Sequence, residues 1–259
     1  MILAFGFDVG WSSSYNALVG LRRYDVQGGE KIEHHFSVQL SKRFSHGIPP
    51  KDVVAALPGI IDAEKRRLTP EAIARSDSLR ARATEIREAA QHEPPARKQT
   101  MLAESAAVME AANHERKIIA VMALDSSNDR SFVEHFPRDL GAHVTRIVIT
   151  SGDTEKMEGA KASVSRAALL SNLYNVSGFN RLHIEPIEGR DALTAEIAGI
   201  QEMITAAHNR VFRKQDNAND DLVMALAMAV WIAGRTASRP TQVRVAPEVA
   251  AHWARGSLR

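Results

Sequence analysis

The chain has 259 residues, 44% of them hydrophobic, which suits one main domain built around one sizeable core. It contains no cysteine, which excludes disulfides, thiolate metal sites and cysteine nucleophiles, so a metal site would have to use oxygen or imidazole ligands. The formal net charge of +2 is too small to argue for a polyanionic partner.

The first forty residues have the pattern of three consecutive β-strands. An apolar run over residues 2–7 ends at Asp8 and predicts a buried strand. Residues 17–24 are again strand-like, the turn residues at 27–29 predict a hairpin, and the alternation over residues 31–40 predicts a third strand. Strands joined by short turns pair antiparallel, so we expect the domain to open with an antiparallel meander.

A helical segment follows this meander. The apolar spacing over residues 51–61 predicts a helix that packs on the sheet. Residues 62–117 are rich in Ala, Glu, Arg and Lys and predict a helical insertion. Within it, helix starts are expected at residues 69–71 and near Thr100, with an interruption at residues 94–95. The mixed charge of the insertion favours a solvated surface over one that grips DNA.

Beyond residue 117 the pattern alternates between strands and helices, which is typical of a parallel sheet. The predicted strands cover residues 118–124, 144–149, 181–184 and 211–213, the predicted helices cover residues 131–140, 163–176, 192–207 and 220–233, and a loop covers residues 150–162. The last helix is apolar nearly all round and should be buried. Three antiparallel strands followed by parallel strands and helices predict an α/β, ribonuclease H-like mixed sheet flanked by helices, over residues 1–233.

The two ends of the chain carry further expectations. Residues 234–259 form a basic C-terminal tail with five arginines and Glu248 as its one acid. Such a tail is either a solvated terminus or an arm that contacts phosphates or a partner. Met1 does not open a basic and then apolar signal segment, and the apolar run at 222–233 is shorter than the ~20 residues that span a bilayer. We therefore expect no membrane partner and a cytoplasmic rather than secreted protein.

Acidic residues stand at the ends of predicted apolar elements. Asp8 and Asp125 each end a strand, where a carboxylate is costly to bury unless it is paired, hydrogen-bonded or bound to a metal. If these strands are neighbours, both carboxylates leave the sheet at one edge, and the Asp220-Asp221 pair at the start of the buried helix can reach the same place. Converging carboxylates repel one another, so their clustering indicates a divalent cation, Mg²⁺ or Mn²⁺ for all-oxygen ligands.

Each of these aspartates also has an ordinary structural explanation. An aspartate after a strand is common in turns, and Asp220 is a good residue to cap a helix N-terminus. Asp129 is a weaker substitute for Asp125 because it lies further into the loop. The combination of acids, rather than any single one, carries the prediction of a metal site.

Several sequence blocks resemble, in order, the nuclease domain of the large terminases of tailed phages. They are Phe-Asp-Val-Gly at 7–10 with Asn-Ala-Leu-Val at 16–19, then residues 144–153, residues 164–170, and Asn-Asp-Asp-Leu-Val-Met-Ala-Leu-Ala at 219–227. The resemblance implies a metal-dependent DNA endonuclease that cuts concatemeric viral DNA during genome packaging. It assigns Asp8, Asp125, Asp220 and Asp221 as catalytic, metal-binding residues. Hydrolysis would use two cations about 4 Å apart, one activating water and one stabilising the leaving 3′-oxygen.

The resemblance also implies partners. Double-stranded DNA is the expected substrate, and candidate phosphate contacts are Lys161, Arg166, Arg213 and Lys214, so that binding would depend on salt and little on sequence. No phosphate-binding Gly-x-x-x-x-Gly-Lys-Ser/Thr motif occurs. The chain is therefore either an excised domain or a nuclease whose ATPase motor is a separate subunit, and Met1 and the length favour the second. A small terminase and a portal would be further partners, in the host cytoplasm.

Three alternatives stay open. A Holliday-junction-resolvase-like or repair nuclease of the same fold would use the same acids on a different DNA shape. A non-catalytic DNA-binding assembly module would keep the fold without cutting. A sugar-kinase-like ATPase would account for residues 8–13, but it needs two such domains and the chain is short for that.

Overall fold

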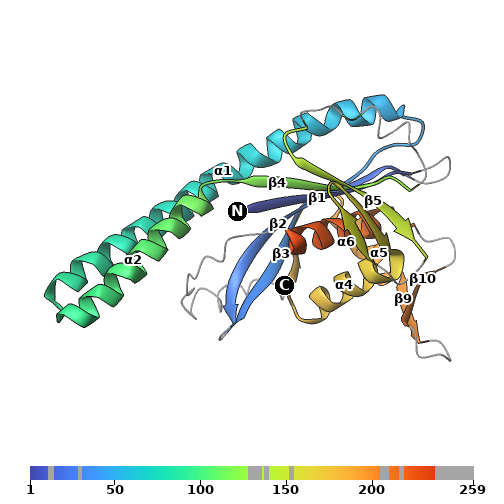
Figure 1. Cartoon of the computed structure of the whole chain (residues 1–259). Helices are drawn as coiled ribbons and strands as arrows, with labels where there is room; N and C mark the ends of the chain where they lie inside the picture. Colours follow the sequence, from blue (N-terminus) through green and yellow to red (C-terminus); the bar gives the residue numbers. More distant parts are fainter. Residues whose placement is uncertain are drawn as a thin grey trace.

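The computed structural model describes residues 1–10, 15–28, 31–127, 136, 140–151, 155–204, 210–215 and 219–236. Its centre is an eight-stranded sheet with the order β6-β7-β5-β4-β1-β2-β3-β8 (Figure 1). These strands are β1 (Ile2–Asp8), β2 (Ala17–Gly28), β3 (Lys31–Arg43), β4 (Ile119–Asp125), β5 (His143–Thr150), β6 (Lys156–Glu158), β7 (Lys161–Ser165) and β8 (Leu182–Ile184). A separate two-stranded hairpin consists of β9 (Ile200–Ile204) and β10 (Arg210–Lys214).

The strand pairing confirms the predicted fold class. β1, β2 and β3 pair antiparallel, whereas β4 runs parallel to β1, β5 parallel to β4, and β7 parallel to β5. An antiparallel meander extended by parallel strands on the side of its first strand is the order expected of a ribonuclease H-like sheet. β6 and β8 add one short strand at each edge.

Helices cover both faces of the sheet (Figure 1). They are α1 (Pro50–Ala89), α2 (Pro95–Glu115), α4 (Arg166–Gly178), α5 (Arg190–Ala198) and α6 (Asp221–Arg235), and the short 3-10 helix η1 (Ala90–His92) joins α1 to α2. On one face, α6 lies against β1, β2 and β4, with α4 and α5 outside it. On the other face the first turns of α1 pack on Leu3, Phe5 and Phe7 of β1. The sheet therefore has a separate hydrophobic core on each side.

The helix α6 packs unusually close to the sheet. Its residues 221–233 are all buried, as the apolar sequence predicted. Gly6 in β1 makes the approach possible, because a Cβ atom added there would lie 1.8 Å from the carbonyl oxygen of Ala225. Successive strand residues point to opposite faces, so Asp8 faces the same side as Gly6. Close packing at Gly6 thus brings α6 next to the strand end that carries Asp8.

The far end of α6 is fixed by a buried arginine. The Nη1 group of Arg23, from β2, donates hydrogen bonds to the carbonyl oxygens of Ala233 and Thr236, the latter at 2.8 Å. The same guanidinium lies 3.3 Å from Asp25. A positive charge at a helix C-terminus is favoured by the helix dipole and satisfies carbonyls that lack partners in the helix. Arg23 therefore holds the C-terminal end of α6 against the sheet.

The helical hairpin of α1 and α2 extends away from the sheet (Figure 1). The expected helix start at residues 69–71 is wrong, because α1 runs through Pro58 and Pro70 without a break. Leu68 and Ala72, on either side of Pro70, are buried, so tertiary packing holds the helix through the proline. The second helix begins at Pro95 rather than near Thr100, with proline in the first turn, where its missing N–H costs nothing.

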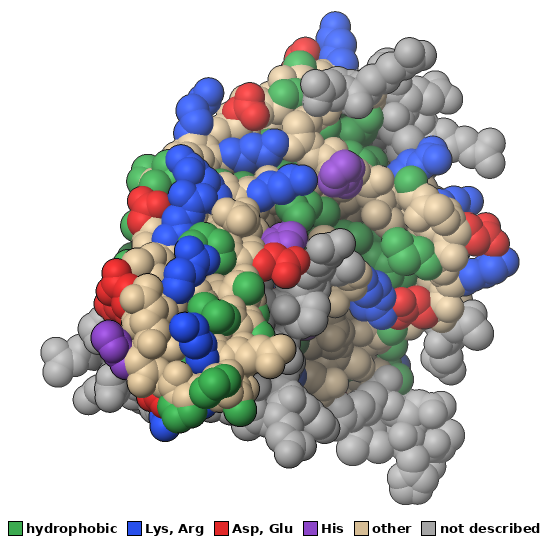
Figure 2. All heavy atoms as spheres, turned by 60° about the vertical axis from the view of Figure 1, so that its left-hand side comes forward, with side chains coloured by type: hydrophobic (Ala, Val, Ile, Leu, Met, Phe, Trp, Pro, Cys, Tyr) green, Lys and Arg blue, Asp and Glu red, His purple; other side chains and the backbone are tan. Residues whose placement is uncertain are grey.

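The surface of this hairpin carries charges of both signs. Figure 2 turns the hairpin side forward and shows Lys and Arg side chains next to acidic ones at several places. Arg67 lies 2.7 Å from Glu64, and Arg75 lies 3.3 Å from Glu71. Ion pairs between residues three or four apart on a helix are worth about 0.3–0.5 kcal/mol each. In the part of the chain that is described, no helix is long and apolar enough to cross a membrane.

Three predicted boundaries differ from the structure. The segment 150–162, expected to be a loop, contains β6 and the start of β7. These two short strands form a hairpin with each other, and β7 also pairs with β5. The helix expected from residue 163 begins after Ser165, whose hydroxyl accepts a hydrogen bond from the Ala168 N–H at 3.0 Å. The helix expected to reach residue 207 ends at Ala198 and is followed by β9. The expected helix at 131–140 falls mainly outside the described residues, as do Asp129 and residues 237–259.

Candidate active site

Two aspartates lie side by side at one edge of the sheet. β1 and β4 pair in parallel, with Phe7 opposite Leu124, so Asp8 and Asp125 are the next residues on the two strands. Val121 and Ala123 belong to the core on the α6 side, so by alternation Asp125 faces that side, as Asp8 does. Asp125 is only 6% exposed. The sequence-based expectation that these two carboxylates emerge together is therefore met.

The start of α6 brings the other two aspartates to the same place. Asp220 is at the N-cap position of α6, but its side chain makes no capping hydrogen bond. Asp221 follows in the first turn, is 6% exposed, and its Oδ2 atom lies 3.5 Å from the backbone N–H of Tyr15. Helix capping therefore does not account for either side chain.

The electrostatics of Asp8 connect all four residues. Burial raises the pKa of Asp8 well above its ordinary value of 3.8, and the charges of Asp125, Asp221 and Asp220 raise it further, against a lowering effect of Arg166. The pKa of Asp221 is raised as well, first by burial, and the Tyr15 N–H opposes this. A like charge nearby raises a carboxyl pKa because it disfavours the ionised form. The structure thus gathers the four predicted acids into one cluster.

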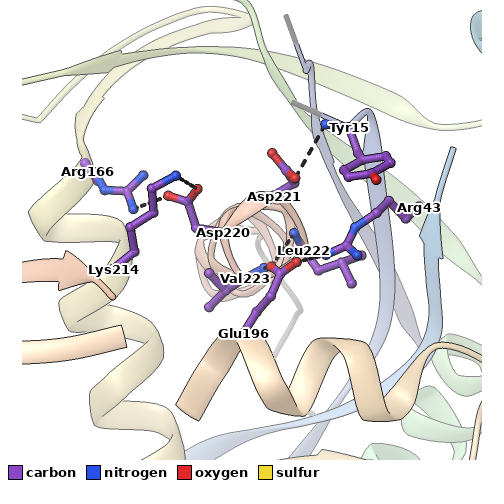
Figure 3. A network of polar contacts seen from close by, with 9 residues as sticks. All are labelled: Tyr15, Arg43, Arg166, Glu196, Lys214, Asp220, Asp221, Leu222 and Val223. Atoms are coloured by element: carbon purple, nitrogen blue, oxygen red, sulfur yellow. Dashed lines mark hydrogen bonds and ion pairs between the residues drawn. The ribbon is translucent and has the colours of Figure 1, made fainter. Parts of the chain in front are cut away.

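Asp220 is the member of the cluster with cationic partners. Its Oδ2 atom lies 2.5 Å from the guanidinium of Arg166, the first residue of α4, and its Oδ1 atom lies 3.1 Å from Nζ of Lys214, at the end of β10. Figure 3 shows both side chains converging on Asp220, whereas Asp221 points the other way, toward Tyr15. Of the four basic residues named from the sequence, Arg166 and Lys214 reach the cluster.

The other two basic residues do not reach it. Lys161 begins β7 and Arg213 lies in β10, and both are exposed. Among the described residues, neither forms an ion pair or hydrogen bond with any of the four aspartates. They remain candidates for phosphate contacts further from the cluster.

The carboxylates do not converge on a single point. Oδ1 of Asp125 accepts hydrogen bonds from the N–H and the hydroxyl of Ser127, at 2.9 and 2.6 Å, and Asp8 accepts none from any described residue. Within the described ranges, no three acidic or histidine side chains are arranged so that they could already hold a metal ion. Asp125, Asp220 and Asp221 are instead each held by a different donor, Ser127, the pair Arg166 and Lys214, and the Tyr15 N–H.

The charge and chemistry of the cluster nevertheless fit a divalent cation. All of its donors are carboxylate oxygens, the ligands that Mg²⁺ and Mn²⁺ prefer. Asp8 has a raised pKa and no hydrogen-bond donor in the described structure, and Asp125 keeps its Oδ2 atom free of described partners. These are the oxygens that a cation would neutralise.

Two further charged residues at this site were not anticipated from the sequence. Glu196 of α5 is 6% exposed, and its Oε2 atom accepts hydrogen bonds from the backbone N–H groups of Leu222 and Val223. Its Oε1 atom pairs with Arg43, at the end of β3. A signal was present, since Glu196 falls three residues after the apolar Leu193 on one face of a predicted helix, where an acid is out of place unless it has a partner.

Comparisons with known proteins give structural matches of low similarity. No model of a known protein family matches the chain, and no curated protein matches it. Among solved structures it is similar to the large terminase nuclease from thermophilic phage G20c, at 17% identity and a TM-score of 0.46, over 88% of this chain and 80% of that one. Structures of that nuclease with bound magnesium and with bound cobalt give TM-scores of 0.45 and 0.43, each over 89% of this chain and 80% of the other. Identity and TM-scores are both low, so these matches assign no activity to the chain.

Proposed function

We propose that the chain is a metal-dependent nuclease that hydrolyses phosphodiester bonds in DNA. The observation that carries this proposal is the cluster of four aspartates, from β1, β4 and the start of α6. Burial raises the pKa of Asp8 well above its ordinary value, and the charges of the other three raise it further. Such a cluster costs stability, and a divalent cation with oxygen ligands would relieve the repulsion. Perturbed acids in one cluster are a frequent mark of an active site.

The contacts support different roles for the four acids. Asp8, Asp125 and Asp221 are the cation-binding carboxylates in this proposal, because each has an oxygen with no cationic partner among the described residues. Asp220 orients Arg166 and Lys214 instead, since each of its oxygens contacts one of them. When bound, Mg²⁺ or Mn²⁺ would supply a hydroxide nucleophile at neutral pH and stabilise charge on the leaving 3′-oxygen. No nucleophilic side chain is then needed.

Arg166 and Lys214 are placed to hold a phosphate of the substrate beside the cluster. Their side chains are 37% and 51% exposed, so both can exchange Asp220 for an anion from solvent. Arg166 can contact phosphate oxygens in bidentate fashion, and Lys214 adds a single charge. Lys161 and Arg213 would add weaker contacts along the same strand of DNA. Binding should therefore weaken as salt rises, with little dependence on sequence.

A more specific proposal is that the DNA is concatemeric viral DNA, cut during genome packaging with a separate ATPase motor, a small terminase and a portal as partners. What supports it is the order of sequence blocks, above all Asn-Asp-Asp-Leu-Val-Met-Ala-Leu-Ala at 219–227. The cluster itself supports cleavage of phosphodiesters generally. Both proposals share one active site and differ only in the substrate that reaches it.

A plasmid assay tests the proposed activity. Supercoiled DNA with Mn²⁺ or Mg²⁺ is incubated with the intact protein, with Asp8→Ala or Asp221→Ala, and with Asp191→Ala as control, an exposed aspartate in the first turn of α5. We expect nicking and linearisation by the intact protein and the control, and a loss of about a hundred-fold or more, ~3 kcal/mol of transition-state stabilisation, in the two site variants.

The remaining outcomes separate the alternatives. Equal cleavage by the intact protein and Asp8→Ala would refute the assignment of the site. DNA binding without cleavage by any variant would indicate a non-catalytic DNA-binding module, and cleavage confined to four-way junctions would indicate a resolvase-like nuclease. In Asp220→Asn we expect cleavage to persist with DNA binding at least as tight, because the variant removes a negative charge that competes with phosphate for Arg166 and Lys214 rather than a cation ligand.

A further inference from the structure

The first turn of α6 is capped from another helix. The backbone N–H groups of Leu222 and Val223 donate to Oε2 of Glu196, at 2.8 and 3.0 Å. These are among the N–H groups that a helix start leaves without carbonyl partners. Figure 3 shows Glu196 rising from α5 beneath the end of α6, on a different side from both aspartates.

This arrangement differs from ordinary capping. Aspartate at the N-cap is one of the most favourable capping residues, and Asp220 occupies that position in α6. Its oxygens, however, contact Arg166 and Lys214. With Glu196 as the cap, Asp220 and Asp221 are both free to turn toward the site.

Glu196 is itself fixed by β3. Its Oε1 atom forms an ion pair with Arg43, whose guanidinium also lies 4.9 Å from the centre of the Tyr15 ring. The Tyr15 backbone N–H lies 3.5 Å from Oδ2 of Asp221. These contacts close a ring from β3 through Glu196, α6 and Tyr15 back to Arg43 (Figure 3). Asp221 is itself a member of this ring, so its position depends on the other members.

The carboxylate of Glu196 adds a further negative charge beside Asp220 and Asp221, which has an electrostatic cost. Burial raises the pKa of Glu196, and the charge of Asp221 raises it further, while the Val223 N–H and Arg43 oppose this. A neutral serine or threonine at the N-cap would satisfy the same N–H groups without adding negative charge. Stability of α6 alone therefore does not explain a buried glutamate here.

We propose that Glu196 is a positioning residue, which fixes the first turn of α6 and thereby the place of the Asp221 carboxylate beside Asp8, and that Arg43 holds Glu196 in place. This inference rests on the proposed nuclease function. Glu196 does not contact the cation or the DNA. It sets the rotation of the turn that carries Asp221, and a shift of about 1 Å at a reacting centre is enough to lower a rate a hundred-fold.

The test compares Mn²⁺ binding with stability. Isothermal titration calorimetry gives the Mn²⁺ Kd, plasmid cleavage gives kcat and KM, and urea unfolding gives stability, for the intact protein, Glu196→Ala and Glu196→Gln. For Glu196→Ala we expect a Mn²⁺ Kd raised about 10- to 100-fold and a lower kcat, with KM for DNA little changed. Glu196→Gln keeps one amide oxygen as an acceptor for the two N–H groups, so it should recover part of the affinity.

Arg23→Met is the matched control. Arg23 binds the last carbonyl groups of the same helix, at the end far from the aspartates, so its loss also destabilises α6. We expect Arg23→Met to lower the urea midpoint while the folded protein binds Mn²⁺ as the intact protein does. If Glu196→Ala behaves in the same way, with lower stability and unchanged Mn²⁺ affinity, its role is structural and the inference is wrong.

Three further outcomes keep the test decisive. If Glu196→Ala does not fold, Arg43→Met replaces it, because that variant leaves the capping oxygen in place and removes only its anchor. A Mn²⁺ Kd raised about 3- to 10-fold would then support the inference, and an unchanged Kd would overturn it. If the intact protein binds no Mn²⁺, the proposed function fails together with this inference. If it binds Mn²⁺ and cuts DNA while the variants match it, only the inference fails.

Discussion

The two ends of α6 are built in opposite ways. At the C-terminal end, Arg23 places a positive charge on the last carbonyl groups, and Asp25 balances that charge. At the N-terminal end, acids outnumber their partners, and the pKa values of Asp8, Asp221 and Glu196 are all raised, in each case first by burial. A helix dipole favours negative charge at its N-terminus by only about 0.3–1 kcal/mol per group at exposed sites. One end is therefore arranged for stability, whereas the other keeps a charge that the fold alone does not balance.

The largest expected loss of stability comes from a substitution at Gly6, where α6 packs against β1. In Gly6→Ala the new Cβ would lie 1.8 Å from the carbonyl oxygen of Ala225, and backbone cannot move aside cheaply. We expect a loss of at least about 3 kcal/mol of unfolding free energy, measured by urea denaturation. Gly234→Ala in the same helix is the control, since nothing lies within 4 Å of its added Cβ, and it should gain roughly 0.5–1 kcal/mol. Equal effects in both variants would mean that α6 does not pack tightly on β1.

A smaller change, a gain in stability, is expected when Asp8 in the acidic cluster is replaced. The folded-state pKa of Asp8 is raised above its ordinary value of 3.8, so the stability that this group contributes is fully present below that pH and is lost as pH rises through the folded pKa. The amide side chain in Asp8→Asn stays neutral at every pH, so the variant does not lose this stability as the pH rises. Without metal at neutral pH, the variant should be more stable than the intact protein by roughly 1–3 kcal/mol.

Urea denaturation at several pH values measures this gain. The difference in unfolding free energy between Asp8→Asn and the intact protein should narrow as the pH is lowered toward 3.8. Near that pH Asp8 is protonated in the unfolded chain as well as in the folded protein. Added Mn²⁺ should stabilise the intact protein and leave the variant nearly unchanged. A variant that is less stable than the intact protein at neutral pH would show that Asp8 is balanced within the fold.

The smallest loss of stability is expected at a partly exposed ion pair near the C-terminal end of α6. Arg235 binds both carboxylate oxygens of Glu155, at 2.7 and 2.5 Å, but both side chains are about one-third exposed. We expect Glu155→Gln to cost about 1 kcal/mol or less, and high salt to reduce the difference, because solvent screens such pairs. A loss as large as that from Gly6→Ala would place an essential contact of α6 at this ion pair.

Sequence patterns were sufficient where local residues decide the structure. The apolar runs ending at Asp8 and Asp125 predicted both strands, because the strand period is local, and the shared sheet edge followed once the two strands paired. The apolar helix opened by the Asp220-Asp221 pair was likewise predictable. The uninterrupted course of α1 through Pro70 was not, because buried residues on either side of that proline override its local preference.

The different contacts of Asp220 and Asp221 could not be predicted, because most of their partners lie far away along the chain. Asp220 and Asp221 are adjacent and chemically identical, so sequence alone gave no reason to separate them. Arg166 and Lys214 distinguish Asp220 from its neighbour, and they come from α4 and β10. Glu196 was missed for the same reason, since its partners Arg43 and Leu222 lie far from it along the chain.

Gly6 also limits the routes by which this chain can change. The atom that a side chain at position 6 would meet is a backbone carbonyl, so no smaller residue at position 225 can make room for it. A lineage that acquires a side chain there must move α6 outward, and Asp221 would then move away from Asp8. Stability and site geometry would be lost in the same step, so selection for either one preserves the other.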